Sequence, residues 1–223
     1  MKKKNWSNII LIVVFFVGLS VLLYPTVSDY WNSLHQSRAI ATYSDAVEEM
    51  DTSDYERMWA EADAYNEELY ESGHGLGLAE DEKKEYDSIL DVSGTGIMSY
   101  IEIPSIKCSL PIYHGTDEAV LQIAVGHIEG SSLPVGGVNT HCVLSGHRGL
   151  PSAKLFSDLD KLEEGDLFMI RTLNQTLTYE VDQIRIVLPE EIDDLEIVEG
   201  EDLCTLVTCT PYGINTHRLL VRG

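Results

Sequence analysis

The sequence predicts a mainly β domain, built as a closed barrel or sandwich, which follows a helical arm and an N-terminal transmembrane helix. Three observations lead to this fold class. An uncharged apolar run opens the chain, a long acidic stretch rich in Ala and Glu follows, and short strands separated by turn residues fill the second half. The chain has 223 residues, of which 44% are hydrophobic, as in folded proteins. We divide it into an anchor at 1–25, an acidic arm at 26–95 and a β domain at 96–223.

The N-terminal apolar segment has the length of a membrane span. Counting from Trp6 to Tyr24 gives 19 residues, about 28 Å of helix. Lys2, Lys3 and Lys4 precede it, and positive charge on this flank favours a cytoplasmic N-terminus. A cleaved signal peptide is the alternative, but no small-x-small cleavage site follows the run. We therefore expect a single-pass anchor in the cell membrane, with the rest of the chain outside the cytoplasm.

Charge and cysteine content limit the function classes. The net charge of −22 repels nucleic acid and anionic lipid, so neither is an expected partner. Cys108, Cys142, Cys204 and Cys209 are widely and irregularly spaced, and no C-x-x-C pair occurs. This spacing favours neither a disulfide framework nor a structural metal, and we expect no cofactor. Three of the four cysteines are expected to be small buried side chains.

The acidic stretch from about Ser28 to Asp91 is predicted to be helical. It contains no proline, and apolar side chains recur at helical spacing, as at Tyr55, Met58 and Ala62. The glycine-rich segment Ser72–Gly77 divides it into two parts. This arm carries no group of residues that suggests chemistry, and we expect it to pack on the β domain.

From about Gly96 onward the pattern changes to short strands. The expected strands cover residues 98–103, 108–113, 142–144, 167–172, 176–187, 203–210 and 217–222. One brief helical stretch is expected near Ser152–Leu159. Many short strands with so little helix suggest a closed barrel or sandwich.

Cys209 is the candidate nucleophile. It lies where the expected strand 203–210 runs out, and alternation places it on one face with Thr205 and Val207. A strand end can aim a reactive thiol while the following loop admits a substrate. A cysteine in such a place is more often a buried bystander, and it acts as a nucleophile only with a base or a cation nearby.

The residues alone leave the partners of Cys209 open. Among the histidines, His147 has the best setting, because glycines flank the His-Arg pair that it begins and permit a close approach of another segment. His127 has a similar glycine frame and remains its rival. Arg218 follows Cys209 on the next expected strand, where a cation would stabilise an oxyanion, but alternation cannot separate it from Arg222.

These segments resemble the sortase family. Residues 205–222, TLVTCTPYGINTHRLLVR, resemble the TLxTC motif of sortases and the arginine strand that follows it. Residues 147–156, HRGLPSAKLF, are similar to the segment around the catalytic histidine of sortases, and 110–115 and 126–137 also match. The resemblance covers about residues 96–223, and the sequences of its motifs are similar to those of the pilus-building members, called class C.

The resemblance implies both a fold and a reaction. Sortases are eight-stranded β-barrels with an anchored N-terminus. By position, Cys209 is implied as the thiol nucleophile, His147 as the acid/base and Arg218 as the stabilising cation. The implied reaction cleaves an LPxTG-like sorting signal of a secreted pilin or surface protein between Thr and Gly, through a thioester. In a pilus sortase the acceptor is a lysine of another pilin; the alternative is a housekeeping sortase, whose acceptor is cell-wall peptide.

Two other function classes fit less well. A papain-like hydrolase is disfavoured because its cysteine precedes its histidine, and a non-catalytic assembly scaffold is disfavoured because all three reactive positions are present. The sequence also departs from pilus sortases in two places. Residues 60–97 contain no proline and so lack the usual Asp-Pro-aromatic lid motif, and the second span that many members carry does not follow Gly223. We therefore expect no self-blocking plug in the arm.

Overall fold

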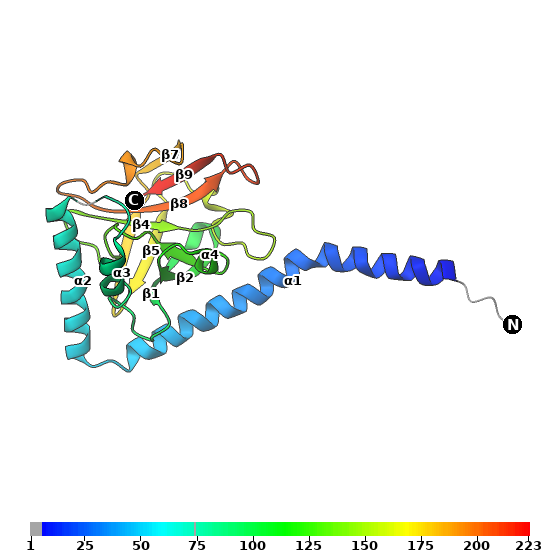
Figure 1. Ribbon diagram of the computed structural model, residues 1–223, viewed down its shortest axis with the longest axis horizontal. Coiled ribbons are helices and arrows are strands. Elements are labelled where there is room, and N and C mark those ends of the chain that lie inside the picture. Colours follow the sequence, from blue (N-terminus) through cyan, green and yellow to red (C-terminus); the bar gives the residue numbers. More distant parts are fainter. Residues whose placement is uncertain (1–5, 74) are drawn as a thin grey trace.

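The computed structural model describes residues 6–73 and 75–223, and Figure 1 shows a curled β-sheet flanked by helices. Lys2, Lys3 and Lys4, on which the predicted orientation depends, lie outside the described residues. The helices are α1 (Trp6–Glu48), α2 (Thr52–Ser72), α3 (Glu80–Tyr86) and α4 (Glu118–Leu121), with 3-10 turns at Pro104–Ile106, Leu159–Lys161 and Asp193–Leu195.

Nine strands in the described part of the chain form one sheet. They are β1 (Ile97–Ile103), β2 (Cys108–His114), β3 (Val125–His127), β4 (Thr140–Ser145), β5 (Leu167–Thr172), β6 (Gln175–Glu180), β7 (Gln183–Val187), β8 (Asp202–Thr210) and β9 (His217–Arg222). Their order across the sheet is β6-β5-β1-β2-β3-β4-β8-β9-β7. The β2–β3 and β4–β8 pairs are parallel and the other pairs antiparallel.

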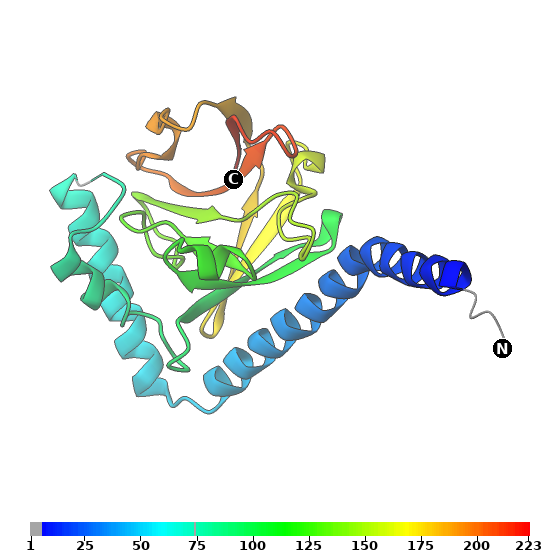
Figure 2. The ribbon, with the colours of Figure 1, turned by 45° about the vertical axis from the view of Figure 1, so that its right-hand side comes forward.

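The predicted mainly β fold is confirmed, with differences in detail. The expected strand 176–187 is two strands, β6 and β7, which lie at opposite edges of the sheet. The chain leaves β6 at Val181, whose side chain is buried, and the backbone N–H of Asp182 donates to Arg222 O at 2.9 Å. There are therefore nine strands instead of eight, and two free edges make the sheet a curled half-barrel instead of a closed barrel (Figure 2).

The brief helix expected near Ser152–Leu159 is not formed. The backbone N–H of Phe156 donates to His147 O at 3.1 Å, and that of Lys154 donates to the Asp29 carboxylate at 2.7 Å. Both donors are used outside a helical pattern, so this segment is a folded loop that ends in the 3-10 turn.

The main hydrophobic core joins the sheet to the helices. Fully buried strand residues such as Ile101 and Phe168 pack in the same cluster as Tyr43 of α1 and Tyr86 of α3. The Tyr43 hydroxyl donates to Met98 O at 3.0 Å and accepts from the backbone N–H of Leu173, which follows β5, at 2.8 Å. Buried tyrosines with satisfied hydroxyls fix orientation as well as bury area. The arm is therefore part of the folded core.

α1 is one continuous helix that runs from the apolar segment into the arm. It is long and apolar enough to cross a membrane. Pro25 lies inside it, and a proline inside a helix removes one backbone hydrogen bond and favours a bend. Figure 1 shows such a bend in the N-terminal half of the helix. The expected boundary at residue 25 is therefore not a break in secondary structure.

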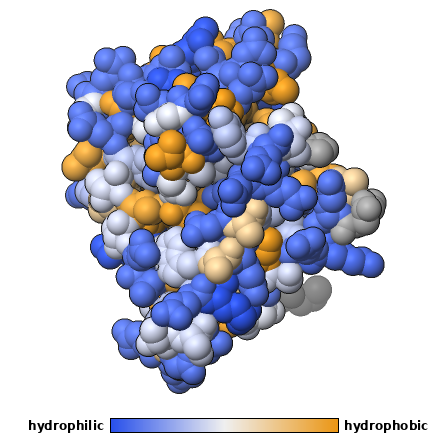
Figure 3. All heavy atoms as spheres, turned by 90° about the vertical axis from the view of Figure 1, so that its left-hand side faces the viewer, coloured by the Kyte–Doolittle hydropathy of each residue, from blue (hydrophilic) through white to orange (hydrophobic). Residues whose placement is uncertain are grey.

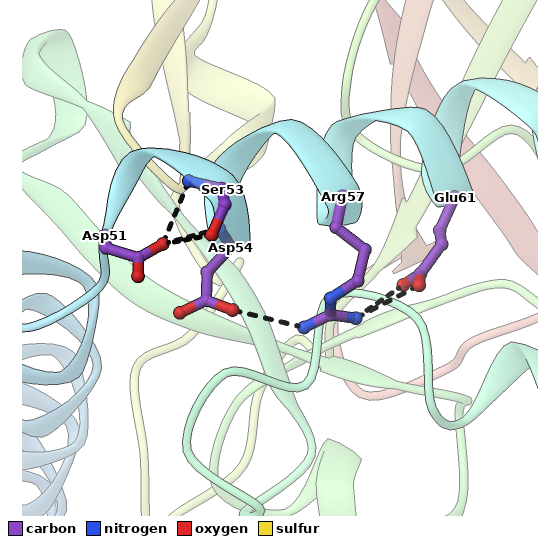
Figure 4. Close-up of polar contacts among 5 residues, drawn as sticks. All are labelled: Asp51, Ser53, Asp54, Arg57 and Glu61. Atoms are coloured by element: carbon purple, nitrogen blue, oxygen red, sulfur yellow. Dashed lines mark hydrogen bonds and ion pairs between the residues drawn. The ribbon is translucent and has the colours of Figure 1, made fainter.

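α2 begins at a capped N-terminus, shown in Figure 4. The Asp51 carboxylate accepts hydrogen bonds from the backbone N–H groups of Ser53 and Asp54 at 2.9 and 3.0 Å. One turn later the Arg57 guanidinium lies between Asp54 and Glu61, at 3.7 and 3.0 Å. These exposed pairs contribute little stability, and the cap defines where the helix starts.

α2 ends at Gly73, whose φ of +61° places it in the left-handed region that glycine adopts without strain. The predicted break at residues 72–77 is thus confirmed. Residues 73–79 form the α2–α3 connection. Figure 3 shows that the outer surface on the α2 side of the molecule is mainly hydrophilic, as expected for an acidic arm.

Candidate active site

Cys209 lies near the C-terminal end of β8, beside β9. The antiparallel register places Cys209 opposite Arg218 and Thr210 opposite His217. Residues directly opposite each other in such a pair project to the same face, with Cβ atoms about 4.5–5.5 Å apart. Arg218 is therefore a neighbour of the Cys209 thiol, whereas His217 projects to the other face.

β4 brings His147 to the same end of β8. Both backbone polar groups of Gly146 are bonded to β8: its N–H donates to Val207 O at 3.0 Å, and its C=O accepts from Thr208 Oγ1 at 2.7 Å. Because β4 and β8 run parallel, the next residue, His147, is reached at the level where β8 reaches Cys209. The structure therefore brings all three predicted residues to one end of the sheet.

The segment that carries His147 requires its two glycines. A Cβ on Gly146 would lie 2.6 Å from the ring of Phe156, which is completely buried. Gly149 has a φ of +80°, and a Cβ there would lie 3.1 Å from the Tyr212 ring. We call residues 146–157 the His147 loop. Its buried Phe156 anchors it in the core, and this fixes the position of His147.

The His147 side chain is 27% exposed, and its Nε2 lies 3.9 Å from Oε2 of Glu118 at the start of α4. Glu118 is much more exposed, at 75%, so this contact is a weak one. Nothing in the sequence pairs these two residues, because the contact depends on how α4 packs beside β3. Glu118 is the acidic neighbour that sequence reasoning missed.

His127, the rival to His147, is a structural residue. It is completely buried; its Nδ1 lies 2.8 Å from the Tyr86 hydroxyl and its Nε2 lies 2.8 Å from Ser132 O. Its ring stacks on Tyr86 with centroids 5.7 Å apart. These contacts join α3 to β3 and leave His127 without access to a substrate.

The register also separates the arginines. Arg222 lies opposite Thr205, and its guanidinium makes two hydrogen bonds to Asp182, at 3.0 and 2.7 Å. Arg148 pairs with Asp160 and is 9% exposed. Arg218 bonds backbone carbonyls at 3.1 and 3.4 Å and has no carboxylate partner in the described part of the chain. Its cationic group is the one that remains available beside Cys209.

The other cysteines lie in poor settings for a nucleophile. Cys142 and Cys204 are neighbours on β4 and β8, and their burial keeps both thiols away from a substrate. Burial raises the pKa of the Cys204 thiol, whereas for Cys142 hydrogen bonds with Cys204 and His127 outweigh burial and lower the pKa to about 6. Burial also raises the pKa of Cys108 to about 12. Cys209 is partly exposed at the strand end. Within residues 6–73 and 75–223, no cluster of His, Cys, Asp or Glu could hold a metal ion.

An apolar strip leads to Cys209 on the same face of the sheet. It consists of Val143, Val187, Leu195, Val207 and Leu220. Val207 precedes Cys209 by two residues on β8, and Leu220 on β9 lies opposite Val207. Both side chains therefore lie on the face of the Cys209 thiol.

The α2–α3 connection reaches this strip. Leu76 packs against it, and the backbone N–H of Gly77 donates to Glu129 O at 2.7 Å. A pocket of about 300 Å³ lies between Leu76, Leu195 and neighbouring residues. The sequence does not predict this contact, because the arm lacks the Asp-Pro-aromatic lid motif. It forms because glycines with positive φ at positions 73 and 77 let the connection fold back onto the sheet.

Comparison of the sequence with known proteins finds similarity to sortases. The sortase domain family matches residues 101–223. Sortase D of Bacillus subtilis (strain 168) is 33% identical over 112 residues, which are 50% of this chain and 54% of that protein. Sortase A of Streptococcus agalactiae serotype III (strain NEM316) is 30% identical over 130 residues, 57% of this chain and 52% of that protein. The chain thus spans about half the length of these curated relatives.

Solved structures are similar over most of the chain. Sortase C1 from Streptococcus agalactiae is 55% identical with a TM-score of 0.80, covering 83% of this chain and 96% of that one. Streptococcus pneumoniae sortase C is 45% identical with a TM-score of 0.76, covering 83% and 95%. Sortase C from Clostridium perfringens SM101 is 41% identical with a TM-score of 0.71, covering 83% and 97%. The chain therefore belongs to the sortase family, and its structural neighbours are the class C members.

Proposed function

We propose that the chain is a membrane-anchored cysteine transpeptidase that joins secreted pilins to one another. Its substrate is an LPxTG-like sorting signal cleaved between Thr and Gly, and its acceptor is a lysine amine of another pilin. One observation carries this proposal: Cys209 and Arg218 are opposite each other at the end of the sheet to which β4 leads His147. The sequence identity of 55% to a sortase C1 supports the pilus class.

The first half of the reaction forms a thioester. The Cys209 thiolate attacks the carbonyl carbon of the Thr–Gly bond, and a tetrahedral oxyanion forms. As this collapses, the C–N bond breaks and its electron pair leaves with the glycine nitrogen, which takes a proton from His147. The threonine carbonyl is then bonded to the Cys209 sulfur.

The guanidinium of Arg218 stabilises the oxyanion. Its Nη1 donates to backbone carbonyls, and its position beside Cys209, without a carboxylate partner in the described residues, leaves the N–H donors of Nε and Nη2 for the substrate oxygen. Removing one such donor costs about 10²–10³ in rate in enzymes of this kind.

The second half resolves the thioester. The acceptor amine attacks the thioester carbonyl and gives a proton to His147, and the C–S bond breaks to restore the Cys209 thiolate. A new amide bond joins the two proteins. Every proton is carried by His147, and we propose no metal or cofactor.

The apolar strip is the surface along which we propose that the sorting signal lies. It is continuous with Cys209, and it is apolar as the Leu-Pro part of the signal requires. Leu76 occupies part of this strip, so the substrate would displace it.

We also infer the arrangement in the cell. Residues 1–25 form a cytoplasmic tip and a membrane anchor, 26–95 the arm, and 96–223 an extracellular catalytic domain. The apolar start of α1 supports the anchor, and the continuation of the same helix past residue 25 joins the anchor directly to the side chains that enter the core. The catalytic domain then faces secreted partners.

The nearest alternative is a housekeeping sortase that attaches proteins to cell-wall peptide. It uses the same thioester and differs only in the acceptor amine. A scaffold without activity would have no chemical need for a partly exposed Cys209 opposite an arginine that has no carboxylate partner in the described residues.

The test is capture of the thioester and its partition between acceptors. The full chain in detergent is incubated with an LPxTG peptide, and the acyl-enzyme is detected by mass, with Cys209→Ala as control. A pilin-derived lysine peptide and a cell-wall peptide then compete for it. No acyl-enzyme would refute the transpeptidase, and transfer to the cell-wall peptide alone would favour the housekeeping activity.

A further inference from the structure

The β8–β9 loop, residues 211–216, exposes two large apolar side chains directly after the candidate nucleophile. Tyr212 is 61% exposed and Ile214 is 67% exposed. These residues are two apart in one loop. The Tyr212 ring packs on Gly149 and lies under the Arg148 guanidinium, yet most of its surface stays in water, and Ile214 adds exposed apolar area. The pair is therefore a candidate contact surface.

The loop lies at the end of the domain that α1 holds. Asn32 Nδ2 donates to Ser152 O, the backbone N–H of Lys154 donates to the Asp29 carboxylate, and Gln36 Nε2 donates to Ile123 O, each at 2.7 Å. These three bonds fix α1 to the His147 loop and to the end of α4.

This attachment lies close to the apolar segment of α1. Asp29 follows Tyr24 by five residues, which is about 7.5 Å along a helix. The Tyr212 ring packs over Gly149 of the His147 loop, so the β8–β9 loop lies next to the attached segment. Figures 1 and 2 both show the β8–β9 loop and the His147 loop on the side of the domain toward which the apolar part of α1 extends.

The charge of this end differs from the charge of the whole chain. The protein has 37 acidic residues, yet residues 147–157 and 203–223 contain none. Tyr30 and Trp31 of α1, at the level of the attachment, are 65% and 63% exposed. Aromatic side chains at this level are typical of a membrane–water interface. The acidic residues nearest to these two segments are Asp29, Glu118, Asp158 and Asp160, and of these Asp158 and Asp160 are paired with lysine or arginine. The repulsion of anionic lipid expected from the net charge is therefore weaker at this end of the domain.

We propose that Tyr212 and Ile214 insert into the interfacial layer of the same membrane that α1 crosses, so that the catalytic domain is held on the outer leaflet at two points. This rests on the membrane anchoring proposed above. Continuity with the span selects lipid over a protein partner as the occupant. The consequence is that the mouth of the site is held at the lipid surface and favours substrates that are themselves tethered there.

The first test measures depth in the bilayer. The full chain with Cys209→Ala and Ile214→Cys is labelled with an environment-sensitive fluorophore and placed in phosphatidylcholine nanodiscs that contain a lipid with a nitroxide near its headgroup. Cys142 and Cys204 are fully buried and the pKa of Cys108 is raised to about 12, so they label poorly at neutral pH. We expect the label at position 214 to be quenched several-fold.

Two matched positions make this test decisive. Val138, at 69% exposure, is as exposed as Ile214 but precedes β4, at the opposite end of that strand, so a label there should be unquenched. Val17, inside the apolar segment, should be quenched by a lipid that carries its nitroxide on the acyl chain at that depth. Quenching at 17 but not at 214 overturns the docking proposal alone. Failure at 17 overturns the anchoring and the docking together.

The second test uses activity in the same nanodiscs. Ile214→Ser should lower kcat/KM several-fold for an LPxTG peptide linked to a lipid and leave the soluble peptide unchanged, while Val138→Ser changes neither. Equal loss on both peptides would mean that the loop acts on the chemistry, which contradicts docking. Absence of cleavage by the unmodified chain would refute the transpeptidase and leave the fluorescence result standing.

Discussion

Cys209 and Arg218 are direct cross-strand partners in the antiparallel β8–β9 pair. Only the loop 211–216 separates the two strands, so its length sets which residues meet. A slip of one residue would turn the arginine to the opposite face, away from the thiol. The relation between the proposed nucleophile and its cation is thus a property of backbone register.

Cys209→Ala should abolish cleavage and acyl-enzyme formation, because the attacking sulfur is lost. The separate changes Cys108→Ala, Cys142→Ala and Cys204→Ala should leave substantial activity, since these thiols are buried or have a raised pKa. Peptide cleavage and mass detection of the thioester measure both. An inactive yet folded Cys142→Ala or Cys204→Ala protein would contradict a single reactive thiol.

Arg218→Lys and Arg218→Ala should each lower kcat by about 10²–10³, because an ammonium cannot reproduce the planar set of donors. Arg222→Lys is the matched control on the same face and strand. It should change kcat little, since Arg222 is bonded to Asp182. If Arg222→Lys were the inactive variant, the oxyanion role would move to that residue.

His147→Ala should remove turnover while binding of the sorting peptide remains, because the imidazole handles protons and lies outside the apolar strip. Fluorescence anisotropy of a labelled peptide measures binding, and cleavage measures turnover. His127→Ala is the informative comparison: it removes buried bonds to Tyr86 and Ser132, so it should lower Tm markedly. An active His147→Ala enzyme would reassign the acid/base.

Leu76→Ser should lower KM for the sorting peptide several-fold, because this side chain occupies part of the apolar strip. A small thiol reagent should label Cys209 at nearly the same rate in both proteins, since Leu76 packs against the strip and lines a pocket with Leu195 that does not include Cys209. Deleting the whole arm is a poor test because Tyr43 and Tyr86 are core residues. A hundred-fold faster labelling of Leu76→Ser would mean that the connection covers the thiol itself.

Stability should fall as the pH drops below about 6.5. Burial lowers the pKa of His141, whose Nδ1 lies 2.7 Å from Glu196 O and whose Nε2 lies 2.7 Å from Thr205 Oγ1. A histidine whose folded pKa is depressed binds its proton more readily in the unfolded chain, so acid favours unfolding. Tm measured across this range should be less pH-dependent in His141→Gln, and an unchanged slope would exclude His141 as a source.

The sequence predicted much of the site and less of its surroundings. The strand ending at Cys209 and the turn around His147 follow from alternation and glycine placement. Arg218 and Arg222 share one face, so only the pairing register separates them. The split of 176–187 into β6 and β7 depends on tertiary pairing at opposite sheet edges, which no local pattern encodes. The contact between Leu76 and the strip arises in the same way, from how the arm packs.

The order of the strands has a consequence for biogenesis. β8 pairs with β4 across a long sequence separation, and β9 lies between β8 and β7 although it follows every other described strand in the chain. Contacts of such separation form late, because loop closure must precede them. With the topology and the catalytic roles proposed above, Cys209 would cross the membrane before Arg218 is in place, and the emerging chain would be inactive until β9 joins the sheet.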